Sequence, residues 1–165
     1  MDGSLGPHTN MTTEVSCVVD SYGPVDLLAL SKAAKPGATT DRSSADSTIG
    51  QLLGGAVDEH RERAQSANPM HYISTNTPPF LILHGSRDPV VPINQSRTLH
   101  EALQAKGVPS TMITIDGGKH GRGFGPETQV LIRRFFDHHL RDITTTWADQ
   151  TLQALPTTKS KDSPR

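Results

Sequence analysis

Asp88 and His120 are the two residues whose types and positions best fit a chemical role. Asp88 follows the apolar run 80–83 in a turn rich in Gly, Ser and Pro, and His120 lies after the next strand-like run, in Asp-Gly-Gly-Lys-His-Gly. A carboxylate that fixes the tautomer of a histidine makes its imidazole an effective general base. Taken singly, Asp88 also fits an ordinary turn and His120 a loop histidine bonded to backbone groups. Their shared placement after successive strands favours an acid–base pair.

The segments around this pair alternate between strand-like and helix-like patterns. Residues 80–83 form a short apolar run closed by His84-Gly85, which is typical of a strand buried on both faces of a parallel sheet. The remaining expected elements are strands at residues 15–19 and 110–115, and helices that open at Pro24 and Pro126 or cover residues 47–53, 58–67 and 94–106. This alternation predicts an α/β fold, with a parallel sheet of about three strands and flanking helices. Since ligands bind beyond the carboxyl ends of such strands, both candidate residues are expected at that edge.

A hydrolase that uses such a pair also needs a nucleophile. Ser4 lies in Asp2-Gly-Ser-Leu-Gly, which resembles the nucleophile elbow Gly-x-Ser-x-Gly, but Asp2 replaces the first glycine and no strand-like run precedes it. Cys17 is the single cysteine and lies in an apolar run, where a buried and inert thiol is expected. The sequence therefore predicts Asp88 and His120 as a catalytic acid and base, and it predicts no nucleophile.

Composition and charge argue against several other classes of function. The chain of 165 residues has a formal net charge of −1, with acidic and basic residues interspersed, so neither a nucleic acid nor an anionic membrane is an expected partner. Hydrophobic residues make up 33% of the chain, which predicts a small core. No stretch approaches the apolar length of a membrane span, and the first residues lack a signal-peptide pattern. These features indicate no particular cellular compartment for the protein.

The motifs predict neither a metal nor a cofactor. There is no His-Glu-x-x-His, and the adjacent His138 and His139 are expected on different faces of a helix. Gly118-Lys119 is followed by His120 rather than by Ser or Thr, so this loop lacks the pattern of a phosphate-binding loop. Gly121-x-Gly-x-Gly also lacks the spacing of a dinucleotide-binding motif.

Several motifs around the pair form a set that is specific as a whole. They are Pro78-Pro-Phe-Leu-Ile-Leu-His-Gly-Ser-Arg-Asp-Pro-Val-Val-Pro, then Asn94-Gln-Ser and Gly117-Gly-Lys-His-Gly. Together they resemble the C-terminal portion of the esterase and lipase branch of the α/β-hydrolases. Val18-Val-Asp-Ser-Tyr-Gly-Pro-Val-Asp-Leu and Ala67-Asn-Pro-Met-His-Tyr-Ile-Ser are similar to segments of the bifunctional feruloyl and acetyl-xylan esterases. The resemblance covers about residues 15–140 and implies that Asp88 is the triad acid and His120 the triad base of a serine esterase.

The resemblance also implies what this sequence lacks. Those enzymes carry the nucleophilic Ser in Gly-x-Ser-x-Gly upstream of the strand that corresponds to residues 15–19, and their oxyanion-hole loop lies earlier still. The chain is therefore expected to hold the last three strands of the family's sheet, as an incomplete hydrolase domain. Without the nucleophile and the oxyanion donors, we expect it to be inactive alone towards acetyl or feruloyl esters.

Two alternative interpretations stay open: a noncatalytic remnant or binding module that uses an exposed sheet edge, and a fragment of a prolyl-oligopeptidase-type peptidase. An unpaired strand edge would also favour self-association. The expected organisation is a polar N-terminal loop at residues 1–14, the C-terminal part of an α/β-hydrolase domain at 15–141 with a flexible excursion at 31–46, and a polar, disordered tail at 142–165.

Overall fold

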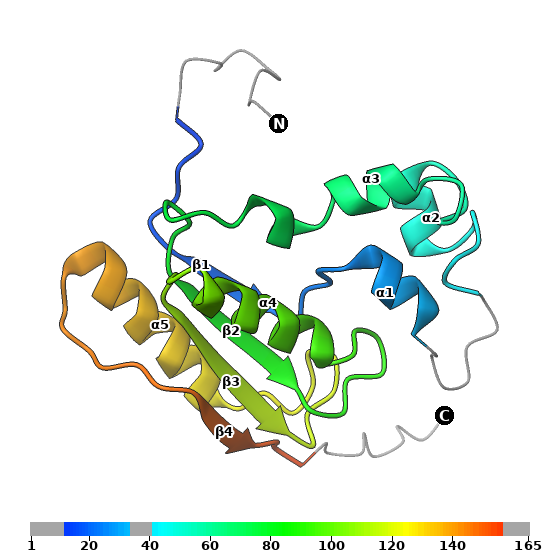
Figure 1. Ribbon diagram of the computed structural model, residues 1–165. Coiled ribbons are helices and arrows are strands. Elements are labelled where there is room, and N and C mark those ends of the chain that lie inside the picture. Colours follow the sequence, from blue (N-terminus) through cyan, green and yellow to red (C-terminus); the bar gives the residue numbers. More distant parts are fainter. Residues whose placement is uncertain (1–11, 34–40, 157–165) are drawn as a thin grey trace.

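A parallel sheet of four strands organises the computed structural model, which describes residues 12–33 and 41–156. The strands lie side by side in the order β1 (Val18–Ser21), β2 (Phe80–Gly85), β3 (Ser110–Asp116) and β4 (Gln150–Gln153), and every neighbouring pair is parallel (Figure 1). The carboxyl ends of all four strands therefore lie at one edge of the sheet. The predicted α/β fold with a parallel sheet is confirmed, with one strand more than expected.

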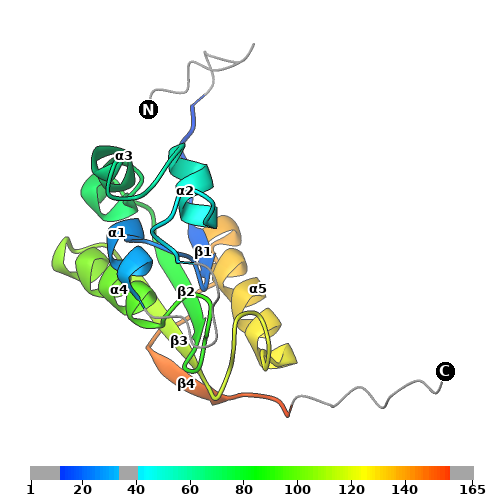
Figure 2. The same ribbon diagram turned by 90° about the vertical axis from the view of Figure 1, so that its right-hand side faces the viewer.

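Helices cover both faces of this sheet. In chain order they are α1 (Leu27–Lys32), α2 (Thr48–Leu53), α3 (Arg61–Ser66), the 3₁₀ turn η1 (Pro69–Tyr72), α4 (Asn94–Ala105) and α5 (Pro126–Arg141). Figure 2 shows the sheet between α4 on one face and α5 on the other. Phe135 of α5 packs in one cluster with Leu81 of β2, whereas Leu103 of α4 packs in another with Ile82. Successive β2 residues thus enter opposite apolar layers, as expected for a strand buried on both faces.

α1, α2 and α3 enclose a small apolar cluster of their own, to one side of the sheet (Figure 1). Ser47 caps α2 by accepting a hydrogen bond of 2.9 Å from the Gly50 amide, and Gly54 ends the helix in the left-handed region at a φ of 83°. Arg42 of the expected excursion donates a hydrogen bond of 2.9 Å to the Val90 carbonyl, in the loop that carries Asp88. Residues 34–40 of that excursion lie outside the described residues.

β4 lies within the segment for which the sequence predicted a disordered tail, and that prediction is wrong for Gln150–Gln153. The strand pairs in register with the end of β3, so that Leu152 lies opposite Ile115. Its polar sequence gives no apolar alternation, because most of its side chains are exposed at the edge of the sheet. Leu152 alone packs against the cluster beneath α5. Residues 157–165 lie outside the described part.

β1 also differs from its predicted position. It covers Val18–Ser21 rather than residues 15–19, and residues 12–14 form neither helix nor strand. Residues 1–11 are not described. Among the described residues, no helix is both long enough and apolar enough to cross a membrane.

Candidate active site

The Asp88 carboxylate is held by the turn that follows β2. One of its oxygens, Oδ1, accepts hydrogen bonds of 2.7 Å from the Val90 amide and 2.9 Å from the Val91 amide. The Asp88 amide donates in turn to the Gly85 carbonyl at 3.3 Å. An Asp that bonds backbone amides two and three residues ahead is a common turn arrangement, and here it buries the whole Asp88 side chain. The carboxylate is therefore already held in place by residues of its own turn.

The loop after β3 brings His120 to the same edge of the sheet. The Arg87 amide donates a hydrogen bond of 2.9 Å to the Gly118 carbonyl, which joins this loop to the one that carries Asp88. A Cβ atom at Gly85 would collide with the backbone of Gly118, so glycine is required where the two strand ends meet. The two predicted site residues are thus brought together by backbone contacts between their loops.

The imidazole of His120 bonds the free oxygen of that carboxylate. Its Nδ1 lies 2.8 Å from Oδ2 of Asp88, while the His120 side chain remains 35% exposed. A carboxylate can only accept here, so Nδ1 carries the proton and Nε2 is left with its lone pair. No described residue hydrogen-bonds Nε2. The arrangement can therefore take up a proton at Nε2 while Asp88 stabilises the resulting imidazolium.

Tyr22 forms one wall of the site, and the sequence analysis did not identify it. Its ring meets the His120 ring edge to face, with centroids 4.5 Å apart, and its backbone adopts a φ of 48°. A left-handed backbone at a bulky residue is uncommon and is tolerated only where surrounding contacts hold it. Gly121, at a φ of 63°, lies close enough that a Cβ there would be 3.1 Å from the Tyr22 hydroxyl. The Tyr22-Gly-Pro turn after β1 was the only sequence signal.

His84 is a second residue that the sequence analysis left without a role. Its side chain is completely buried, and its Nε2 lies 3.4 Å from the same Asp88 oxygen that bonds His120. Burial lowers the pKa of the His84 imidazole, although a hydrogen bond to the Val91 carbonyl and the nearby carboxylates of Asp88 and Asp20 oppose this shift. His84 is therefore held in its neutral form beside the acid.

The remaining candidates lie apart from the pair or cannot be placed. Ser4 lies outside the described residues. Cys17 is only partly buried and packs beneath α5, and burial raises the pKa of its thiol, so it is a poor nucleophile. His138 and His139 were expected on different helix faces, yet their ring centroids lie only 4.6 Å apart. No cluster of three metal-ligating side chains exists among the described residues.

The parallel sheet, with an acid and a histidine on loops beyond successive strand ends, defines a chain of the α/β-hydrolase fold. Two family models match this sequence: BD-FAE over residues 1–103 and TAP-like protein over residues 57–151. The chain therefore belongs to the BD-FAE family, and its predicted resemblance to the α/β-hydrolase esterases is confirmed.

Two solved structures with a similar fold match most of this chain. A bifunctional GH43-CE protein from Bacteroides eggerthii matches 86% of this chain with a TM-score of 0.69 and 31% identity. A truncated form of a carbohydrate esterase from gut microbiota matches 83% with the same TM-score of 0.69 and 28% identity. The match covers 19% of the first structure and 47% of the second.

Sequence relatives include both esterases and peptidases. The chain is 38% identical over 66 residues, 39% of its length, to esterase LipC of Mycobacterium tuberculosis. It is 28% identical over 127 residues, 73% of its length, to dipeptidyl peptidase family member 6 of Caenorhabditis elegans. These matches span 16% and 17% of the two relatives, so their activities bear on this chain only as proposals.

Proposed function

We propose that Asp88 and His120 are the acid and the general base of a serine hydrolase that acts on carboxylic esters. The observation that carries this proposal is the hydrogen bond of 2.8 Å between Asp88 Oδ2 and His120 Nδ1, which leaves Nε2 open at the carboxyl edge of a parallel sheet. Membership of the BD-FAE family and the similarity to esterases support the ester-hydrolase class.

In this mechanism Nε2 of His120 removes the proton of a serine hydroxyl while the serine oxygen bonds to the ester carbonyl carbon. The tetrahedral intermediate collapses, the bond to the alcohol oxygen breaks, and Nε2 returns its proton to the leaving alkoxide. A water molecule then attacks the acyl-enzyme by the same route, which releases the carboxylic acid and restores the serine. Asp88 stays ionised and holds the Nδ1 proton throughout.

The proposal assigns the nucleophile to residues outside this sequence. No Gly-x-Ser-x-Gly occurs in the 165 residues, so this chain by itself supplies only the acid and the base. Without a nucleophile no acyl-enzyme forms, and missing oxyanion donors would remove roughly a further 10²–10³-fold of rate. We therefore expect the isolated chain to hydrolyse esters at the background rate.

Acetyl or feruloyl esters of a carbohydrate are the substrates that we propose. The basis is the similarity to two proteins described as carbohydrate esterases, at 31% and 28% identity. A peptidase is the second candidate, because the C. elegans dipeptidyl peptidase relative aligns over 73% of this chain. An amide substrate would use the same pair, with His120 protonating a leaving amine.

A short-chain aryl acetate assay tests the chain itself. We expect the purified chain and its His120→Ala variant to hydrolyse the ester at the same rate. A rate that His120→Ala abolishes would show that a nucleophile within this chain serves His120, which would overturn the external assignment.

The coding sequence immediately upstream of Met1 supplies the second test. We expect an in-frame Gly-x-Ser-x-Gly there, and we expect the extended polypeptide to hydrolyse aryl acetates and feruloyl esters faster than aminoacyl anilides. Loss of this activity on replacing that serine would support the proposal. The absence of the motif, or an extended protein without activity, would contradict it.

A binding role through the outer edge of β1 remains the alternative from another class. β1 is the first strand in the sheet order, and no described residue pairs with its outer edge. Unpaired edges favour association between chains, so we propose that the isolated chain self-associates through β1. Light scattering would then give a mass above 17.8 kDa that rises with concentration, whereas a monomer at all concentrations would contradict the proposal.

A further inference from the structure

Two imidazoles lie against the Asp88 carboxylate, although a serine hydrolase needs only one. His120 Nδ1 and His84 Nε2 approach the same oxygen, Oδ2, at 2.8 Å and 3.4 Å. His120 is partly exposed and reaches the open side of the site, whereas the His84 side chain is completely buried beneath it. Because of this burial, His84 cannot contact a substrate, and any effect it has on the reaction must pass through its buried neighbours, Val91 and Asp88.

The bonds around His84 determine which of its nitrogens carries the proton. Nε2 lies 2.8 Å from the Val91 carbonyl, which can only accept, so the proton is on Nε2. Nδ1 then accepts a hydrogen bond from the Ser96 hydroxyl of α4, at 2.6 Å. Both groups are fully buried, so water does not compete for either bond. His84 is therefore fixed as a neutral Nε2–H donor.

This donor holds the loop that bonds the carboxylate. The Val90 and Val91 amides donate to Oδ1 and His120 donates to Oδ2, whereas the His84 Nε2–H donates to the Val91 carbonyl and lies 3.4 Å from Oδ2. Val91 takes part twice, since its amide bonds Asp88 and its carbonyl accepts from His84. His84 thus restrains the loop that holds the carboxylate, and Asp88 cannot rotate without breaking its bonds to that loop and to His120.

The charges that face His84 come from three directions. Asp20 approaches from β1, Asp88 from the loop after β2, and His120 from the loop after β3. A neutral His84 leaves the full negative charge of Asp88 to stabilise an imidazolium at His120. A charged His84 would instead be a competing partner for that charge. The buried environment therefore suits a group that orients Asp88 without neutralising it.

We propose that His84 is a positioning residue: its fixed Nε2–H donor, locked by Ser96, holds the Val91 peptide, and the Val91 amide in turn holds Asp88 in place to bond the His120 Nδ1–H. This inference rests on the proposed function of Asp88 and His120, and it adds a third residue to their unit. It can be measured in the isolated chain, because the Asp88–His120 hydrogen bond needs no nucleophile. The hydrolysis assays therefore test the proposed function, and the following experiment tests the role of His84 separately. Either result can be negative without affecting the other.

The readout is the solvent exchange rate of the His120 Nδ1 proton, measured by NMR in ¹⁵N-labelled chain. We expect this rate to increase about tenfold or more in His84→Leu, which removes both polar nitrogens. In His84→Gln the side-chain amide places a donor where Nε2 stood, so we expect a rate within about threefold of the wild type. His100→Gln is the matched control, because His100 is also a buried imidazole bonded to a carboxylate but lies remote from Asp88; we expect no change.

Ser96→Ala provides a second route if His84→Leu does not fold. Without the Ser96 hydroxyl, Nδ1 of His84 loses its donor, and the tautomer with the proton on Nδ1 becomes accessible. The Nε2 donor is then lost for part of the time, so we expect His120 Nδ1–H exchange to be several-fold faster. An exchange rate unchanged in folded His84→Leu or in Ser96→Ala would overturn the proposal, as would His84→Gln exchanging as fast as His84→Leu.

Discussion

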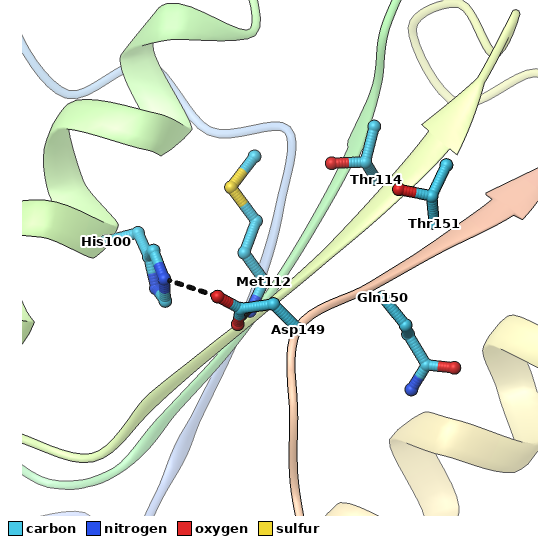
Figure 3. Close-up of a pocket in the computed structure, with 6 residues that line it drawn as sticks. All are labelled: His100, Met112, Thr114, Asp149, Gln150 and Thr151. Carbon is cyan, nitrogen blue, oxygen red and sulfur yellow. Dashed lines mark hydrogen bonds and ion pairs between the residues drawn. The ribbon is translucent and has the colours of Figure 1, made fainter.

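Two imidazole–carboxylate pairs in this molecule use the same residue types in opposite ways. At the carboxyl edge, Asp88 is completely buried and His120 is 35% exposed, with 2.8 Å between them. Near the amino end of β3, His100 lies 3.1 Å from Asp149, but there the imidazole is only 10% exposed and the carboxylate is 54% exposed (Figure 3). The exposed partner is thus the base in one pair and the acid in the other.

Bonding at the second ring nitrogen separates the two pairs chemically. His100 Nδ1 lies 2.8 Å from the Ser110 hydroxyl and its Nε2 from Asp149, so both nitrogens are occupied. The other oxygen of Asp149 accepts a hydrogen bond of 2.7 Å from the Met112 amide of β3. A Ser, a His and an Asp are therefore linked here as well, with His100 Nδ1 accepting from the Ser110 hydroxyl, but they lie near the amino end of β3 rather than at the carboxyl edge. This difference teaches that placement at the carboxyl edge of the sheet, rather than the presence of the three residue types, distinguishes the candidate active site.

The second pair has a structural consequence instead. Asp149 immediately precedes β4, and its bonds to His100 and Met112 attach that edge strand to α4 and β3. In Figure 3 a hollow beside the pair is lined by residues of α4, β3 and the β4 segment: His100, Met112, Thr114, Asp149, Gln150 and Thr151. The carboxylate joins α4 and β3 beside this hollow, so we interpret the pair as an anchor for β4.

The largest expected difference between the pairs lies in catalysis. In a polypeptide that also carries the serine, Asp88→Asn is expected to lower kcat/KM for an aryl acetate by about 10³–10⁴-fold, because His120 loses its fixed tautomer. The matched change Asp149→Asn is expected to alter kcat/KM by less than about twofold. Similar losses of kcat/KM in Asp88→Asn and Asp149→Asn would show that the two pairs do not differ in catalysis.

Anchoring of β4 gives the next largest effect. Asp149→Ala removes two hydrogen bonds to a carboxylate, so we expect the free energy of unfolding to fall by about 1 kcal/mol and the β4 amides to exchange faster. Asp137→Ala is the control, since its bond to Arg141 at 3.0 Å is an exposed pair within one helix and is expected to contribute less than about 0.5 kcal/mol. Urea unfolding and amide exchange measure both, and unchanged β4 exchange in Asp149→Ala would refute the anchor.

Buried imidazoles also predict a pH dependence. The pKa of folded His84 is lowered by burial, so below the ordinary histidine pKa of about 6.5 the unfolded chain binds a proton that the folded chain does not. Stability contributed at neutral pH is therefore lost as the pH falls below about 6.5. Asp20 has the opposite effect on stability. Burial raises the pKa of its carboxyl, so as the pH falls the folded chain binds this proton before the unfolded chain does, which favours the folded state.

The variant His84→Gln isolates this effect, because glutamine does not titrate. We expect the free energy of unfolding in urea to decrease less between about pH 7.5 and pH 5 in His84→Gln than in the wild type, by up to about 1.4 kcal/mol for each pH unit below the unfolded pKa. Identical pH profiles for the two proteins would show that the folded state accepts the proton without cost.

The sequence predicted the carboxyl-edge pair because its signals are local. Asp88 follows an unbroken apolar strand and precedes a proline, and His120 lies in a glycine-rich loop after the next strand, so both could be placed before any tertiary contact was known. The α/β alternation likewise depends on periodicity within each segment. Fold and acid–base candidates were therefore readable from short windows of sequence.

The residues that were missed depend on contacts between distant segments. β4 has no apolar alternation, and Asp149 is tied to the Met112 amide, 37 residues earlier in the chain. Tyr22 faces His120 only because β1 and β3 lie on either side of β2. His84 appeared to be merely the end of a strand, since its bond to Ser96 forms only once α4 packs on the sheet. Tertiary packing, rather than local propensity, supplied these three features.

The smallest expected effect tests whether the His100–Asp149 pair takes part in ester hydrolysis. Ser110→Ala removes one neutral hydrogen bond to His100, so we expect a loss of about 0.5–1 kcal/mol of stability and no change in the rate of aryl acetate hydrolysis. Ser110 begins β3 at the amino end of the strand, away from the carboxyl edge where parallel α/β sheets bind ligands, so its hydroxyl is not expected to meet the ester although His100 Nδ1 accepts from it. If the isolated chain hydrolyses the ester and Ser110→Ala abolishes that rate while His120→Ala does not, the reactive site is at His100, and the comparison is reversed.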